Sequence, residues 1–255
     1  MSTNALADWF TTPLGAYLLE RERAFLDAAT PDLFGFHALQ IGLPQVDLLR
    51  ENRITHRLRV APGSPASLLA KSHELPIATH SVDLVVLPHV LEFAPDPHAV
   101  LREVDRVLMP EGRLIILGFN PWSLWGLRSA VGPGRETSPW NGRFVSLPRV
   151  KDWLSLLGFE ASAGRLACYV PPVRAEKWLS RLAFMEQAGN RWWSVGGAVY
   201  MLEAIKRVAG VRVIHPKWQE RPAREKPLAV AARRAGGASR TGGLARDPAP
   251  LRLVK

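Results

Sequence analysis

The chain has 255 residues with near-average hydrophobic and charged fractions, 47% and 22%, a formal net charge of +10 and a single cysteine. This composition predicts a soluble globular protein with one large α/β domain or two small ones, and one cysteine excludes an internal disulfide. No stretch reaches the ~18 uninterrupted apolar residues that cross a bilayer, and the first ten residues lack the basic and apolar parts of a secretion signal. We therefore expect a cytoplasmic protein without stable membrane insertion.

The first element in chain order is a helix capped by Thr11 or Thr12, with Pro13 near its first position. Apolar residues at helical spacing continue to Leu26, so residues 1–34 are predicted to form an N-terminal helical segment. We expect this segment to cover the ligand side of the domain that follows.

The central part of the chain predicts a strand, a crossover helix and a second strand. Residues 82–87 form a near-continuous apolar run, which is typical of a strand buried on both faces of a parallel sheet. Asp96 is a natural N-cap, followed by Pro97 and an apolar stripe on one side of a helix. A turn over residues 110–112 then leads to a second buried strand over residues 114–117. Such right-handed units build open α/β sheets with ligands beyond the carboxyl ends of the strands.

This central pattern resembles the middle of class I S-adenosylmethionine-dependent methyltransferases, of the type 11 kind, and the resemblance extends over roughly residues 35–207. The family typically shows an LPF-type segment, an FDLV strand, a DP-capped helix ending in RVLKPGG, and a further strand. The resemblance implies an open, mostly parallel Rossmann-like sheet with helices on both faces and an antiparallel last strand, within a domain over residues 35–215. The matching residues are Leu75, Pro76, Asp83, Leu84, Asp96, Pro97, Leu101, Glu103, Arg106, Val107, Leu108, Pro110, Gly112 and Leu114.

S-adenosylmethionine is the cofactor that the resemblance implies, but the usual binding loop is altered. Where the family has an acid at the end of the first strand and then three alternating glycines, this chain has Gln40, Gly42, Pro44 and Val46. Proline lacks an N–H and fixes φ, so the loop cannot copy the usual glycine-rich loop, whose backbone closely approaches the cofactor. No acid follows the next strand. The cofactor contacts implied by the resemblance are Gln40, Gly42, Glu74, Pro88 and His89.

His89 is also the expected catalytic base if the acceptor must lose a proton, because it follows the end of the central strand; a contact to backbone or to the adenosyl group is an equal alternative. The segment after the next strand is expected to shape an acceptor pocket, with Trp122 and Trp125 as walls, Asn120 beside them and Arg128 for an anionic group. Core packing of both tryptophans is equally compatible with the sequence. The histidines show no metal-ligand spacing, so we expect no metal.

Residues 216–255 carry ten basic and three acidic residues, a charge of +7, in a setting rich in Ala, Gly and Pro. This tail is predicted to be disordered, either as a solvated end or as a nonspecific contact to nucleic acid. Three functions stay open. They are a methyltransferase acting on a small or aromatic acceptor, a noncatalytic methyltransferase-like scaffold, and an RNA methyltransferase assisted by the tail.

Overall fold

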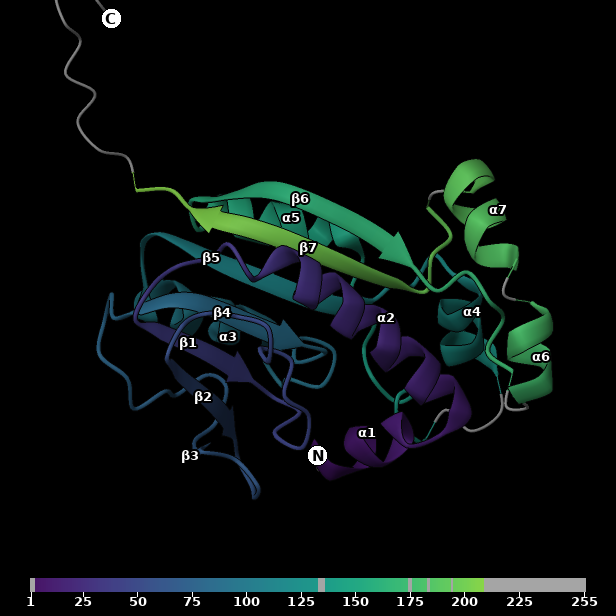
Figure 1. The fold of residues 1–255 in the computed structure, drawn as a ribbon, viewed down its shortest axis with the longest axis horizontal. Coiled ribbons are helices and arrows are strands. Elements are labelled where there is room, and N and C mark those ends of the chain that lie inside the picture. Colours follow the sequence, from purple (N-terminus) through teal and green to yellow (C-terminus); the bar gives the residue numbers. More distant parts are fainter. Residues whose placement is uncertain (1–2, 133–135, 174–175, 183, 194, 209–255) are drawn as a thin grey trace, which may run out of the picture. The chain divides into compact units, whose positions relative to one another are not determined.

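The structure, a computed structural model, describes residues 3–132, 136–173, 176–182, 184–193 and 195–208 (Figure 1). The predicted basic tail over residues 216–255 therefore lies outside the described residues. Within them, no helix is both long and apolar enough to span a membrane. The helices are α1 (Thr3–Phe10), α2 (Pro13–Ala29), α3 (Pro97–Val107), α4 (Leu124–Val131), α5 (Leu147–Leu156), α6 (Glu176–Arg181) and α7 (Phe184–Trp192). The strands are β1 (His37–Ile41), β2 (His56–Ala61), β3 (Leu68–Leu69), β4 (Val82–Pro88), β5 (Leu108–Phe119), β6 (Phe159–Ala167) and β7 (Val199–Lys206).

The seven strands form one sheet in the order β3-β2-β1-β4-β5-β7-β6. Neighbours from β3 to β5 pair in parallel, whereas β7 runs antiparallel to both β5 and β6. The prediction of a mostly parallel Rossmann-like sheet with an antiparallel last strand is confirmed. Since β1, β2 and β4 run the same way, their carboxyl ends share one edge of the sheet.

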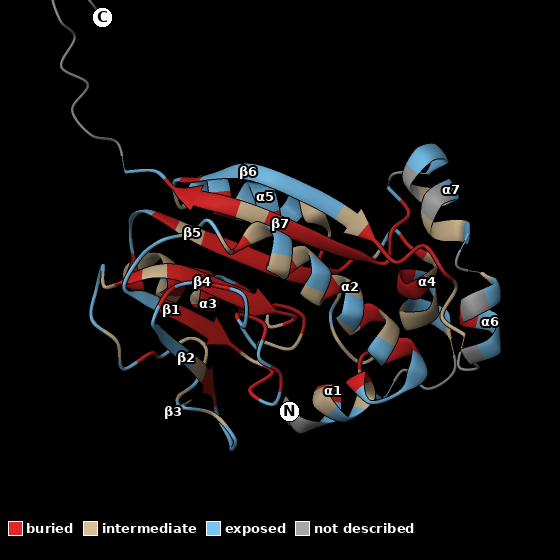
Figure 2. Ribbon diagram, in the orientation of Figure 1, coloured by how far each residue is buried: buried red, intermediate tan, exposed pale blue. Residues whose placement is uncertain are grey.

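Helices cover both faces of the sheet (Figures 1 and 2). On one face, Val104 of α3 and Val150 of α5 pack in one cluster with strand residues such as Val85. On the other, Leu26 of α2 packs with Leu84. Leu84 and Val86 thus face one layer of helices, and Val85 and Leu87 face the other, which explains why residues 84–87 are all apolar. The predicted helix starts are confirmed by side-chain caps: Thr12 accepts from Gly15 N, and Asp96 accepts from His98 N and Ala99 N.

The turn predicted over residues 110–112 is not a separate element, because β5 begins at Leu108 and runs through it. Val82 pairs with Leu108 and Leu84 with Arg113, so the residues between them bulge out of the ladder. Glu111 has a φ of 63°, a conformation that non-glycine residues seldom adopt. The expected turn chemistry is therefore present, but it produces a bulge inside a longer strand.

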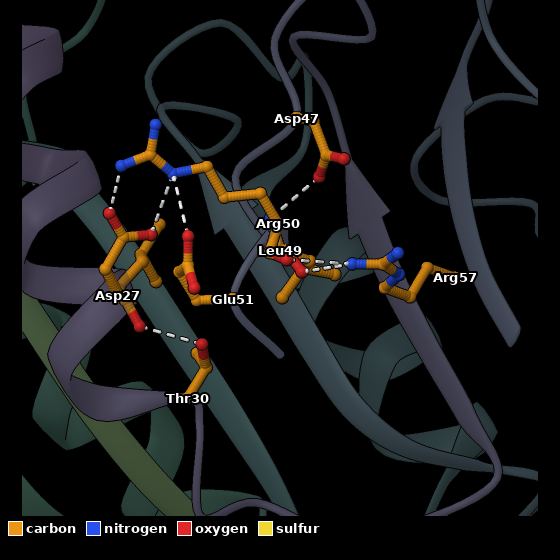
Figure 3. A network of polar contacts seen from close by, with 8 residues as sticks. Asp27, Thr30, Asp47, Leu49, Arg50, Glu51 and Arg57 are labelled. Atoms are coloured by element: carbon orange, nitrogen blue, oxygen red, sulfur yellow. Dashed lines mark hydrogen bonds and ion pairs between the residues drawn. The ribbon is translucent and has the colours of Figure 1, made fainter. Parts of the chain in front are cut away.

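The side of the sheet with β2 and β3 is short, because β3 has only two residues. Residues 42–55, between β1 and β2, contain no helix in the structure. Instead, polar contacts tie this segment to its surroundings (Figure 3). Arg50 bonds to Asp27 of α2, and Arg57 Nη1 donates to Leu49 O at 2.7 Å. The loop after β1 is thereby fastened to α2 rather than built into a crossover helix.

Candidate functional site

A cavity of about 390 Å³ lies at the carboxyl ends of β1, β2 and β4. Its floor comes from strand ends, including Ile41, Val60 and Pro88, and Leu6 of α1 also lines it. The N-terminal segment therefore contributes to the ligand side of the sheet. This is the edge where open α/β sheets bind ligands, and the volume lies in the range of small-molecule sites.

Gly42 lines this cavity in a conformation that only glycine adopts without strain. Its φ is 90°, and a Cβ at this position would lie 2.9 Å from Cγ2 of Val90. Leu43 follows with a φ of 44°. The glycine at the first position of the altered loop is thus required by its backbone conformation and by its packing against Val90.

Gln40 holds this loop from below and does not line the cavity. Its side chain is fully buried, and Nε2 donates to Gly42 O at 3.1 Å, Leu43 O at 2.9 Å and Val46 O at 2.9 Å. Oε1 accepts from Leu48 N at 3.1 Å. The amide expected to contact the cofactor is therefore engaged by the loop backbone, and its observed role is to fix the loop. A carboxylate could not replace it, because three of its four partners are acceptors.

His89 lies at the end of β4 and lines the cavity, with a φ of 52°. Its ring is buried and stacks on Phe119, with the ring centroids 4.1 Å apart. Nε2 lies 2.6 Å from Oε1 of Glu22, and Nδ1 lies 3.6 Å from Oε1 of Glu92. Burial by itself would lower the pKa of His89, but the two carboxylates outweigh it and raise this pKa to about 10. The two carboxylates thus favour the protonated imidazole.

This ion pairing does not favour the expected general-base role of His89, because a ring that carries its proton cannot take another. Glu92 is buried and accepts from Phe119 N at 2.6 Å, which links the end of β4 to β5. Glu22 was not predicted to belong to a site. Its signal in the sequence is an acid at helical spacing between two buried leucines, Leu18 and Leu26, on the core side of α2.

Acidic residues are missing from the cavity wall: none of its lining residues in the described part of the chain is Asp or Glu. Glu74, expected to reach inward, is exposed and pairs with Lys71 at 3.2 Å, so that cofactor contact is not formed. Pro88 lines the cavity as expected. Among the five expected cofactor residues, the structure therefore brings Gly42, Pro88 and His89 together at the cavity.

The four residues expected to form an acceptor pocket are not gathered in one place. Asn120 is buried and donates to Val195 O and Gly197 O, both at 2.9 Å, so it joins β5 to the segment before β7. Trp125 is fully buried, and its Nε1 donates to Val170 O at 2.8 Å, whereas Trp122 is 73% exposed. Trp125 therefore packs in the core. Trp122 neither packs in the core nor lines the main cavity.

Of these four, Arg128 lines a second cavity of about 350 Å³. Trp9 and Trp140 form apolar walls there, and the guanidinium of Arg128 lies 4.6 Å from the ring centroid of Trp140. Ser138 lines both cavities, which places them side by side. The site therefore consists of a main cavity at the strand ends and a second, adjacent cavity lined by Trp9 and Trp140.

Comparison with known proteins agrees with this geometry. Residues 38–116 match the family described as a methyltransferase domain. The uncharacterised protein YafS of Escherichia coli (strain K12) is 42% identical over 154 residues, 60% of this chain and 64% of that protein, so the chain spans less than two thirds of its length. A malonyl-[acyl-carrier protein] O-methyltransferase of Laribacter hongkongensis is 32% identical over 101 residues, 40% of this chain and 34% of that enzyme.

A crystal structure of an S-adenosylmethionine-dependent methyltransferase of Thermotoga maritima, described as a possible histamine N-methyltransferase, has the same fold. Its TM-score is 0.58 at 19% sequence identity, over 78% of this chain and 93% of that one. The family match covers the strands whose carboxyl ends form the main cavity, and the strand order beyond it continues the fold. Residues 38–116 thus match a methyltransferase domain, and the chain has the fold of S-adenosylmethionine-dependent methyltransferases, both consistent with the class I family.

Proposed function

We propose that the chain transfers a methyl group from S-adenosylmethionine to a small or aromatic acceptor. The observation that carries this proposal is the cavity of about 390 Å³ at the carboxyl ends of β1, β2 and β4. Gly42 lines this cavity, and the volume of the cavity suits a small-molecule ligand. The residues present fit an adenosyl donor in position and size, although no acidic side chain lines the wall.

When bound, the donor supplies a methyl group that passes to an acceptor atom as the sulfonium becomes a thioether. Such an in-line displacement depends mostly on holding the two reactants close together in a dry site. The residues Gly42, Val90 and Phe93 of the main cavity would hold the donor. His89 would keep the end of β4 in place rather than remove a proton.

The acceptor would enter from the second cavity, whose Trp9 and Trp140 walls favour a flat apolar group. Arg128 lines the same cavity and suits an anionic substituent on that group. The L. hongkongensis relative acts, by its name, on a malonyl group of an acyl-carrier protein. An acceptor with one carboxylate is therefore a suitable first member of a test series.

Binding of the donor can be tested by calorimetry with S-adenosylmethionine and S-adenosylhomocysteine. We expect micromolar to millimolar association with the native chain and its loss in Ser72→Trp, which places an indole on the cavity wall. Ser67→Trp is the matched control, since Ser67 is exposed and does not line the cavity. If neither compound binds the native chain at millimolar concentration, the noncatalytic scaffold would replace this proposal.

The RNA alternative depends on the tail, which lies outside the described residues. Its charge of +7 would attract phosphate regardless of sequence. Methyl transfer from labelled donor to total RNA, compared with transfer to aromatic carboxylic acids, separates the two acceptor classes. Label found only in RNA would overturn the small-acceptor proposal.

A further inference from the structure

Exposed aromatic side chains gather on α6, on α7 and the residues just after it, and on the turn before α4. Seven Phe and Trp side chains are more than half exposed in the described part of the chain, and five of them belong to this region. Large apolar side chains are usually exposed singly, so such a concentration marks an interaction site. We call the five the aromatic surface: Trp122, Trp178, Phe184, Trp192 and Trp193, which are 51–82% exposed.

The segments that carry the aromatic surface are fastened to one another. Trp122 N donates to Oδ1 of Asn120 at 3.1 Å, and Nδ2 of the same asparagine donates to Val195 O, in the segment after α7, at 2.9 Å. α4 and α6 meet in one apolar cluster that includes Trp125 and Leu179. Figure 1 shows α4, α6 and α7 together at one end of the sheet, and Figure 2 shows that α6 and α7 are mostly exposed. The five aromatic side chains therefore belong to one region of the molecule.

Basic side chains lie among these aromatic rings. Lys177, Arg181 and Arg191 are exposed on α6 and α7. The guanidinium of Arg181 lies 5.5 Å from the ring centroid of Trp178, and that of Arg191 lies 5.8 Å from the ring centroid of Trp192. Each of these contacts holds a positive charge beside an exposed indole.

Acidic residues of the same helices offset this charge only in part. Glu186 of α7 is turned inward, because its Oε1 accepts from Tyr17 Oη at 2.8 Å and from Tyr169 N at 3.1 Å. Glu176 begins α6, whereas α4 contains Arg128 and no acidic residue. The region thus combines exposed tryptophans with an excess of basic side chains.

This composition suits the interface of an anionic lipid bilayer. Indole is apolar with one polar N–H and settles at the level of the lipid headgroups, and basic side chains attract anionic lipids. None of the five aromatic side chains lines either cavity of the site. A fluid bilayer can receive such projecting side chains without a preformed complementary surface. A second copy of the chain would instead bring basic side chains against basic side chains, which is unfavourable.

We propose that the aromatic surface docks the protein onto an anionic lipid bilayer. The short helices would lie among the headgroups, since no described helix is long and apolar enough to cross the bilayer. The second cavity adjoins this surface, because Arg128 of α4 lines it and donates from Nη1 to Pro172 O, before α6, at 3.0 Å. Docking would therefore place that cavity at the membrane. This inference goes beyond the proposed function and does not depend on binding of the donor.

The test is co-sedimentation of the full chain with phosphatidylcholine vesicles, with or without phosphatidylglycerol, at about 0.1 M and about 0.5 M salt. We expect the native chain to bind the anionic vesicles and to keep part of this binding at the higher salt, because salt does not screen apolar burial. Trp122→Ser combined with Trp192→Ser should lower the partition coefficient about a hundredfold. Burial of half of an indole's roughly 200 Å² supports about tenfold for each ring.

A second variant tests the basic side chains. Arg181→Gln combined with Arg191→Gln should lower binding to the anionic vesicles about 25-fold, about fivefold for each charge. Binding to vesicles of phosphatidylcholine alone should not change, because the lost attraction is to anionic lipid. An equal loss on both kinds of vesicle would contradict the charge complementarity and overturn the proposal of an anionic bilayer.

Matched controls lie outside the aromatic surface. Phe34→Ser combined with Phe36→Ser removes two aromatic side chains of similar exposure, 72% and 76%, from the segment before β1. Arg149→Gln removes a guanidinium that lies 5.4 Å from the ring centroid of Trp153, both on α5. Each control should change the partition coefficient by less than about twofold, because distant charges are screened.

Three outcomes would overturn the inference. The first is no binding of the native chain to either kind of vesicle, which would leave a protein partner for this surface. The second is equal binding of the native chain and the double tryptophan variant that disappears at the higher salt, because the basic tail alone would then explain it. The third is a dimer in sedimentation velocity that the tryptophan variant loses. If the double variant does not fold, Trp192→Ser alone, at the most exposed of the five positions, replaces it.

Discussion

Replacing Gln40 by glutamate would restore the acid that the family usually has at the end of the first strand, yet we expect it to destabilise this chain. The Nε2 amide donates to three backbone carbonyls of the loop, and Oε1 accepts from one N–H. An ionised glutamate has no proton to donate, so its second oxygen would face three carbonyl oxygens. A protonated glutamate could satisfy one of them.

The cost follows from the bonds that are lost. Two of the three donated bonds are buried, and a buried polar group left without a partner costs about 1–3 kcal/mol. Because the three carbonyls lie together and their losses are not additive, we expect Gln40→Glu to lower the free energy of unfolding by about 3–5 kcal/mol. With a urea m-value of about 2 kcal/mol/M, the unfolding midpoint would fall by about 2 M.

Urea unfolding followed by tryptophan fluorescence measures this midpoint. Gln45→Glu is the matched control, because Gln45 lies in the same loop with an exposed side chain, and its midpoint should shift by less than about 0.3 M. The destabilisation of Gln40→Glu should also shrink at low pH, where the carboxyl is protonated. An unchanged or higher midpoint for Gln40→Glu at pH 7 would refute the role assigned to the amide.

Three other changes test the site and its support. Gly42→Ala places a Cβ 2.9 Å from a neighbouring methyl at a φ of 90° and should cost about 1–2 kcal/mol of unfolding free energy, whereas Gly63→Ala, with nothing within 4 Å, should have no measurable effect in urea unfolding. Trp125→Ala should cost about 3–5 kcal/mol and Trp122→Ala less than about 0.5 kcal/mol, and equal losses on thermal unfolding would contradict their opposite burial. The pKa of His89 is raised from its ordinary 6.5 to about 10, so the stability from its ion pair is complete below about pH 6.5 and is lost as the pH rises through about 10; an NMR titration that finds a neutral ring at pH 8 would show the pairing to be wrong.

Local periodicity was sufficient to predict the central strands and α3, because apolar runs and caps are properties of neighbouring residues. The bulge in β5 could not be predicted in the same way. It arises because Leu108 pairs with Val82 before Arg113 pairs with Leu84, and such pairing is set by the sheet. A sequence read alone shows only the turn residues and not the strand that continues through them.

The site was less predictable than the fold, because spacing does not give the direction of a side chain. Trp122 and Trp125 are three residues apart, but one is exposed and the other lies in the core. Gln40 was correctly placed at the end of β1, yet its partners come from a loop whose course the sequence does not specify. The pairing of Glu22 with His89 joins residues 67 positions apart, which no local pattern reveals.

The Glu22–His89 pair also indicates which residues a shortened protein would need to keep. The family match starts at residue 38, and a shortened protein starting at residue 35 would include every strand of the sheet. It would nevertheless lack α2, leaving the imidazolium of His89 without its counterion and uncovering the face on which Leu26 packs. The first two helices are thus an integral part of the folded unit that forms the cavity, and a protein restricted to the matched segment would separate His89 from the carboxylate of α2 that pairs with it.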